Sequence, residues 1–301
     1  MLRHAGVRTL CALLGVALLP ACLRAQQEIA LAFRPVVGST PFRCTASYAG
    51  VGRSGARVTV TDFKLYVHDL RVELADGTLV PVTLADEAPW QSNGVALLDF
   101  EDAAGPCANG TPETRAVVRG TAPIAAAAEV RAVRFTVGVP FAQNHADLAQ
   151  QRGPLSLTRM FWSWNAGYKF ARIDLRSVAA DGTGTPVPWM IHLGSTGCTP
   201  SGSATAAPLR CAQPNRAEIT VAGLDLERDA IAVDLAALLA QSDVLRNTPK
   251  TAAGCMSGPT DPDCGPLFAA LGLPHPAATA RTGAPVFRVA PGAARAEQGA
   301  R

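Results

Sequence analysis

The sequence predicts an all-β protein: an antiparallel immunoglobulin-like β-sandwich with long loops and few short helices, stapled by disulfides. Three observations lead to this fold class. Many short stretches alternate apolar and polar residues, turn-forming Gly, Pro, Asn and Asp separate them, and cysteines are frequent for a chain of this length. One strand places four residues on the same face: Val133, Phe135, Val137 and Val139. With 48% hydrophobic residues, the 301-residue chain can bury a large core.

Ten segments have the pattern of strands: residues 28–36, 57–74, 79–84, 95–100, 115–121, 130–139, 168–178, 187–193, 217–222 and 230–235. Within 57–74 the apolar phase flips twice, which predicts a bulge or a bend between two strands. Short helices are expected over 234–240 and 266–271. The Pro-, Ala- and Arg-rich tail, residues 274–301, is expected to be disordered, so the sandwich domain spans residues 26–273.

The first residues have the layout of a secretory signal peptide. Arg3 and Arg8 precede an apolar run that is too short to span a bilayer. Two forms of processing remain open. Removal of residues 1–25 would give a soluble protein, whereas the four residues that end at Cys22 resemble a lipobox and would give a lipid-anchored one. Both predict export, with the periplasm as the expected location, and no later stretch resembles a transmembrane segment.

Charge argues against a nucleic-acid partner. Without Arg3, Arg8 and Arg24 of the leader, the remaining basic residues equal the 24 acidic ones in number. The chain after the leader therefore has no net positive charge, and it contains no run of basic residues. Neither nucleic acid nor an anionic membrane surface is an expected ligand.

Six cysteines follow the leader, and an even number in an oxidising compartment predicts three disulfides. Their connectivity is not fixed by the sequence. Proximity along the chain favours three pairs: Cys198 with Cys211, Cys255 with Cys264, and Cys44 with Cys107. A thiolate metal site would need spacing of the CxxC type, which does not occur.

Catalytic signatures such as GxSxG, HExxH or a P-loop are absent, and the histidines become the candidates for chemistry. His145 follows a strand at a sheet edge, and His192 ends a strand that leads to Cys198. Two imidazoles at one end of a sandwich suit copper or zinc, with Met160 or Met190 as a soft third ligand for copper(I). The alternative is that each is a hydrogen-bonded loop residue.

Tryptophans form the second unusual set. Residues 160–170 are the densest aromatic segment, and core packing is the simplest role for at least one of Trp162 and Trp164. Trp90 differs, because polar turn residues surround it and predict an indole that can be reached from outside.

These pieces, in this order, resemble the MbnP-like family, also called metallo-mystery pair four-Cys-motif proteins. The matching segments are residues 90–91, 97–100, 138–140, 144–145, 160–170, 192–198 and 254–256, with Cys264. The resemblance implies a periplasmic, non-catalytic copper-binding protein. It also implies an MbnH-like partner, a dihaem cytochrome of the cytochrome c peroxidase family that oxidises a Trp of its client to kynurenine near the copper.

Residue by residue, the resemblance assigns the metal to His145 and His192 and gives no ligand role to His68. The candidates for the modified residue are Trp90, Trp162 and Trp164. Two other functions remain open: a metal-free adhesion or scaffolding sandwich, and an envelope hydrolase or oxidase, for which Asp147 beside His145 is the only hint.

Overall fold

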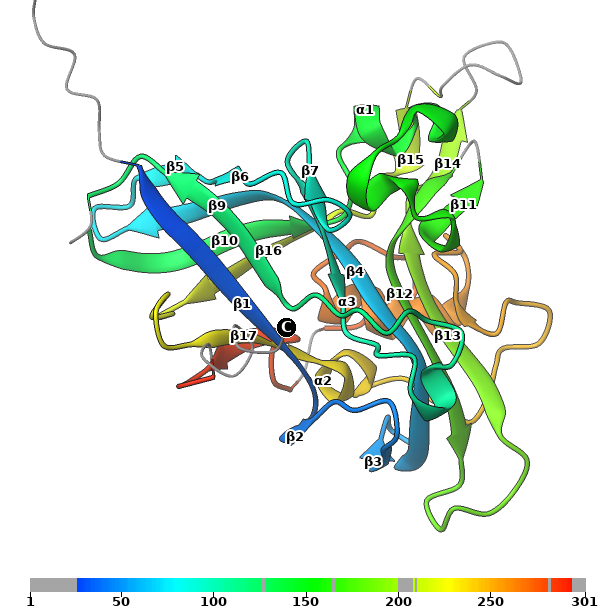
Figure 1. Cartoon of the computed structure of the whole chain (residues 1–301). Coiled ribbons are helices and arrows are strands. Elements are labelled where there is room, and N and C mark those ends of the chain that lie inside the picture. Colours follow the sequence, from blue (N-terminus) through cyan, green and yellow to red (C-terminus); the bar gives the residue numbers. More distant parts are fainter. Residues whose placement is uncertain are drawn as a thin grey trace, which may run out of the picture.

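The computed structural model describes residues 26–125, 128–163, 166–199, 208, 210–280 and 283–293. The expected leader, residues 1–25, and Trp164 lie outside the described residues. The described chain is mostly β, as predicted, and forms two sheets and a separate two-stranded ribbon. Figure 1 shows this ribbon beside the first helix, at one end of the molecule.

The smaller sheet has the strand order β19-β17-β1-β9-β6, with β2 paired to β1. Its strands are β1 (Gln27–Val37), β2 (Thr40–Pro41), β6 (Thr83–Leu84), β9 (Val117–Ala122), β17 (Ala230–Asp234) and β19 (Phe287–Ala290). Most neighbours are antiparallel, but β1 and β17 are parallel.

The strand β19 lies in the tail that was expected to be disordered, and for these four residues the expectation is wrong. Its backbone pairs with β17, and the Phe287 ring packs edge-on against Phe135, with the ring centroids 5.4 Å apart. An apolar anchor and a free strand edge are enough to order a segment whose composition resembles a linker.

The larger sheet has the path β16-β10-β4-β12-β13-β18, with five further strands attached to it. Its members are β3 (Ser47–Val51), β4 (Ala56–Leu74), β5 (Leu79–Pro81), β7 (Gln91–Ser92), β8 (Val95–Asp99), β10 (Val130–Val137), β11 (Phe161–Ser163), β12 (Gly167–Val178), β13 (Val187–Gly194), β16 (Ala217–Ala222) and β18 (Gly254–Cys255). The strand β4 crosses the molecule in Figure 1 and carries most of these partners.

The two phase flips predicted within 57–74 correspond to irregularities in one continuous strand. The ladder of β4 with β12 shifts register between Val60 and Asp62, and the ladder with β10 shifts between His68 and Arg71. Asp69, inside the second shift, has a φ of 53°. These bulges let the apolar side chains of one long strand stay in the core while the strand bends.

The core lies between the sheets and consists mostly of aliphatic side chains, with several aromatic contacts among them. Phe33 of β1 meets Phe135 of β10 edge-on at 5.5 Å, and Phe63 of β4 contacts both Phe42 and Phe100. All three predicted disulfides form: Cys44–Cys107, Cys198–Cys211 and Cys255–Cys264. The second joins facing residues of the ribbon strands β14 (Thr196–Thr199) and β15 (Arg210–Gln213).

Helices are short, as expected. They are α1 (Phe141–Asn144), α2 (Leu235–Leu239) and α3 (Gly265–Ala270), with 3-10 turns η1 (Gly105–Cys107), η2 (Leu148–Gln150), η3 (Gly153–Ser156), η4 (Thr158–Met160) and η5 (Pro262–Cys264). Asp234 begins α2 by accepting the backbone N–H groups of Ala236 and Ala237. Among the described residues, no helix has the length and apolar character needed to cross a membrane.

Candidate metal centre

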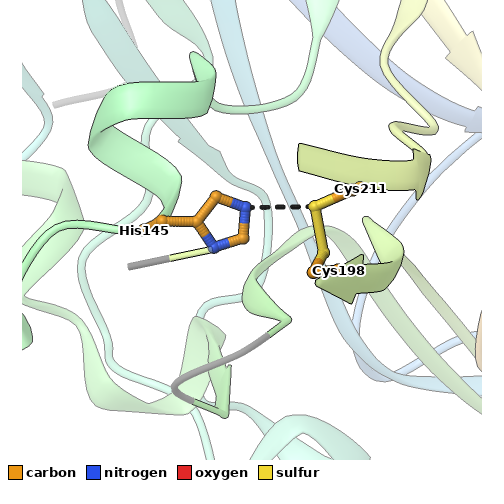
Figure 2. A group of neighbouring side chains, drawn as sticks. All are labelled: His145, Cys198 and Cys211. Carbon is orange, nitrogen blue, oxygen red and sulfur yellow. Dashed lines mark hydrogen bonds between the residues drawn. A yellow bond between two sulfur atoms is a disulfide. The ribbon is translucent and has the colours of Figure 1, made fainter. Parts of the chain in front are cut away.

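His145 lies at the end of α1, beside the β14–β15 ribbon. Its side chain is buried, with 4% of the residue exposed, and its ring contacts Phe141 in a tilted arrangement, with the ring centroids 4.7 Å apart. The Nε2 atom lies 3.1 Å from Nδ2 of Asn144 and 3.3 Å from Sγ of Cys211. Figure 2 shows the ring pointing at the Cys198–Cys211 disulfide.

The neighbouring amide is held in one orientation by the backbone. Asn144 Oδ1 accepts the N–H of Tyr168 at 2.8 Å, and its Nδ2 donates to the carbonyl of Ala166 at 3.2 Å. Its Nδ2 therefore also presents a hydrogen to His145, whose Nε2 is the acceptor. Nδ1, the other ring nitrogen of His145, is buried and has no hydrogen-bond partner among the described residues.

A guanidinium stands over the same region. Arg216 donates from Nε to the carbonyl of Val139 at 2.7 Å, and its charge lies over the rings of Phe141 and Phe170 at 5.9 and 5.5 Å. Burial, together with the smaller effect of the Arg216 charge, lowers the pKa of His145 to about 4. The imidazole is therefore neutral at pH 7, the form that binds a metal.

His68 shares these properties although the sequence assigned it no ligand role. It lies on β4 opposite Val95, and its Nε2 is buried without a hydrogen-bond partner among the described residues. Burial lowers the pKa of His68 to about 4; Asp69 opposes this shift and Arg216 adds to it. Two neutral imidazoles thus share one cationic neighbour. The signal in the sequence was a histidine inside an apolar strand, beside the second phase flip.

His192 has a different environment. It lies on β13 with its Nε2 2.8 Å from Oδ1 of Asp174, and its ring meets Trp162 edge-on at 6.3 Å. Asp174 is paired in turn with Arg172 at 2.8 Å. Among the described residues no contact joins His192 to His145, so the predicted pairing of these two histidines stays a prediction without a contact that supports it.

Comparison with known proteins agrees with the resemblance seen in the sequence. A family model described as MbnP matches residues 26–257. The chain belongs to the MbnP family. Among solved structures, MbnP from Methylosinus trichosporium is 30% identical, with a TM-score of 0.74 over 89% of this chain and 99% of that one. No curated protein matches.

The remaining predicted site residues of this MbnP-family chain lie in different elements: Met160 in η4, Met190 on β13, Trp162 on β11 and Trp90 just before β7. Met160 is fully buried in the core, and Met190 is half-buried two residues before His192 on β13. Trp90 and Trp162 are both half-buried, and Trp90 packs against the main core, so it is less accessible than its polar neighbours predict.

Two other polar residues have local structural roles. His275 donates from Nε2 to the carbonyl of Gly258 at 3.0 Å, as expected for a hydrogen-bonded loop histidine. Asp147 accepts the N–H of Ala149 at 3.0 Å and so begins η2. The side chain of Asp147, which was the only hint of hydrolase or oxidase chemistry, therefore has a structural role as the cap of this 3-10 turn.

A buried charge cluster was missed entirely by sequence reasoning. Lys64 on β4 lies 3.4 Å from both Asp62 and Asp99 and also pairs with Glu101; all four side chains are at most 5% exposed. Arg172 joins Asp62 at 3.2 Å, which connects the cluster to the Asp174–His192 pair. Burial raises the pKa of Asp99 to about 7, against the lowering effect of Lys64.

Proposed function

We propose that this MbnP-family protein is a non-catalytic, periplasmic copper-binding protein, and that His145 and His68 hold the metal at the α1 end of the sandwich. The observation that carries the proposal is the pair of neutral imidazoles, each with a buried ring nitrogen that lacks a hydrogen-bond partner among the described residues. A buried polar atom without a partner is costly unless a ligand satisfies it, and neutral imidazole suits copper.

The surroundings of His145 fit a metal on Nδ1. A metal on Nδ1 would move the ring proton to Nε2, which would then give up the hydrogen bond from Asn144 and donate to the Cys211 sulfur at 3.3 Å instead. The charge of Arg216, which acts on both rings, opposes a dication twice as strongly as a monocation. This favours copper(I) as the bound ion.

We also propose that an MbnH-like dihaem cytochrome of the cytochrome c peroxidase family oxidises a Trp of this chain to kynurenine. Ring opening replaces the donor-only indole by an amine and a carbonyl that can approach a metal. Trp90 is the first candidate, because it precedes the β7–β8 hairpin, where the carbonyl of Asn93 accepts from Gln143 of α1 at 3.0 Å. Trp162 and Trp164 are the other candidates.

Copper titration of the oxidised protein tests the metal site. We expect one tightly bound copper, lost or weakened at least about tenfold in His68→Ala and in His145→Ala. His192→Ala is the matched control and should leave the affinity unchanged, because its Nε2 is already paired with Asp174. Full binding in the His68→Ala plus His145→Ala variant would refute the site and favour the adhesion or scaffolding alternative. Peptide mass spectrometry with and without the cytochrome tests the oxidation of Trp90.

A further inference from the structure

We propose that the Cys198–Cys211 disulfide is a redox-gated copper(I) site: reduction by a dithiol frees two thiol groups that bind copper(I) together with Nε2 of His145. The proposal shares His145 with the copper function above but does not rest on it, since it concerns the reduced protein and a different set of donors.

The geometry of the three residues carries the inference. Their ligand atoms all lie within 4.8 Å of one another, and Nε2 of His145 is 3.3 Å from Sγ of Cys211 (Figure 2). Metal bonds of about 2.0–2.3 Å place donors roughly 3.5–4 Å apart around one ion. Once the S–S bond is broken, small side-chain rotations are enough to bring the two sulfurs and the nitrogen to that separation.

Access distinguishes this disulfide from the other two. Cys198 and Cys211 are half-buried, whereas Cys44, Cys107, Cys255 and Cys264 are at most 2% exposed. Thiol–disulfide exchange needs an approaching thiolate at the sulfur, so a dithiol reaches the ribbon first. The S–S bond takes two electrons and two protons from the dithiol, which leaves as a disulfide. Each thiol then gives its proton to solvent as its bond to copper forms.

The ribbon is held by bonds that do not depend on the disulfide. Ser195 donates to the carbonyl of Pro214 at 2.9 Å, and Asn215 donates to the carbonyl of Gly194 at 2.8 Å. The disulfide spans a sequence separation of 13, against 63 for Cys44–Cys107, and a shorter loop restrains the unfolded chain less. Reduction should therefore leave the two cysteines facing each other across β14 and β15.

The donor set favours copper(I) over zinc. Two soft thiolates and one imidazole suit copper(I), which accepts three donors, whereas a structural zinc site takes four. In the part of the chain that the structure describes, no fourth His, Cys, Asp or Glu belongs to this group. The oxidised protein would lack these thiolates, so the redox state would set how tightly copper is held.

The test compares oxidised and gently reduced protein under anaerobic conditions. A phosphine reductant opens the disulfide and is removed, alkylation with mass spectrometry identifies the free cysteines, and copper(I) is titrated against a chromophoric chelator. We expect Cys198 and Cys211 to be freed first and the affinity for copper(I) to rise at least about tenfold. X-ray absorption should then report sulfur bound to copper.

Three outcomes would overturn the proposal. They are an equal affinity for copper(I) in both redox states, the opening of another disulfide before this one, and a gain that persists in the Cys198→Ser plus Cys211→Ser variant. Should that variant not fold, alkylation of both thiols in the folded wild type replaces it and must abolish the gain. Absence of copper from the oxidised protein alone would refute the His68–His145 site and leave this one standing.

Discussion

Replacing Lys64 by methionine tests whether the buried charge cluster is a requirement of the fold. The change keeps a long apolar stem but removes the ammonium that faces three carboxylates: Asp62, Asp99 and Glu101. Breaking a buried ion pair by removing one partner costs about 3–5 kcal/mol. For a chain of this size that corresponds to a fall in Tm of roughly 6–20 °C.

The pH dependence makes the prediction sharper. Asp99 has its pKa raised to about 7 even with the ammonium present, so without it the carboxyl is protonated still more readily. A protonated carboxyl has little need of Lys64, and the loss in Lys64→Met should be smaller at pH 5 than at pH 8. Thermal and urea denaturation at both pH values measure it. Arg71→Met, in an exposed pair with Asp69, is the control and should cost about 0–1 kcal/mol.

A Lys64→Met variant that stays within about 1 kcal/mol of the wild type at pH 8 would refute this reasoning, because the carboxylates would then be solvated or neutral without the ammonium. An equal loss of stability at both pH values would refute only the role given to carboxyl ionisation, and not the requirement for Lys64.

Three further outcomes follow from the same structure. Because the folded pKa of Asp99 is raised, this residue contributes stability that is present below its ordinary pKa of 3.8 and is lost as the pH rises through about 7. The Asp99→Asn variant lacks this titration. Its midpoint of urea denaturation should therefore depend less on pH over this window than that of the wild type. Gly167→Ala places a Cβ against the end of α1 at a φ of +77°, and should lower Tm more than Gly184→Ala, where φ is +95° and the space is open. Tyr66→Phe removes a buried hydroxyl that donates at 2.8 Å to a carbonyl of η3, and should cost about 1–3 kcal/mol in urea denaturation.

The strands and their irregularities could be predicted closely, because both are encoded locally. The alternation within residues 57–74 changes phase at Val60–Phe63 and again at Val67–Leu70, and the register of β4 shifts at those same places. A bulge moves side chains between faces, so the sequence must change phase where the backbone does. Two of the three disulfides, Cys198–Cys211 and Cys255–Cys264, also join cysteines that are close in sequence, so proximity along the chain was enough to predict them.

The site could be predicted only in part, because its environment comes from distant segments. Asp62 and Lys64 alternate with apolar neighbours and so resemble a solvent-facing strand surface. In the structure Asp99 and Glu101 pair with Lys64, and Gly110 lies close against the Glu101 carboxylate. A period of two cannot say whether the polar face is covered. His68 was overlooked for the same reason, since its cationic neighbour Arg216 is remote in sequence.

The position of β4 in the larger sheet determines how much of the chain must be present before this strand has all its partners. Five strands pair with it, and they come from both sides of it in sequence, as early as Ser47 and as late as Val178. A chain still being synthesised therefore carries a long apolar strand with one open edge until β12 has been made. Folding should wait for Val178, and N-terminal fragments that stop before it should be captured by chaperones or aggregate rather than form a smaller stable sandwich.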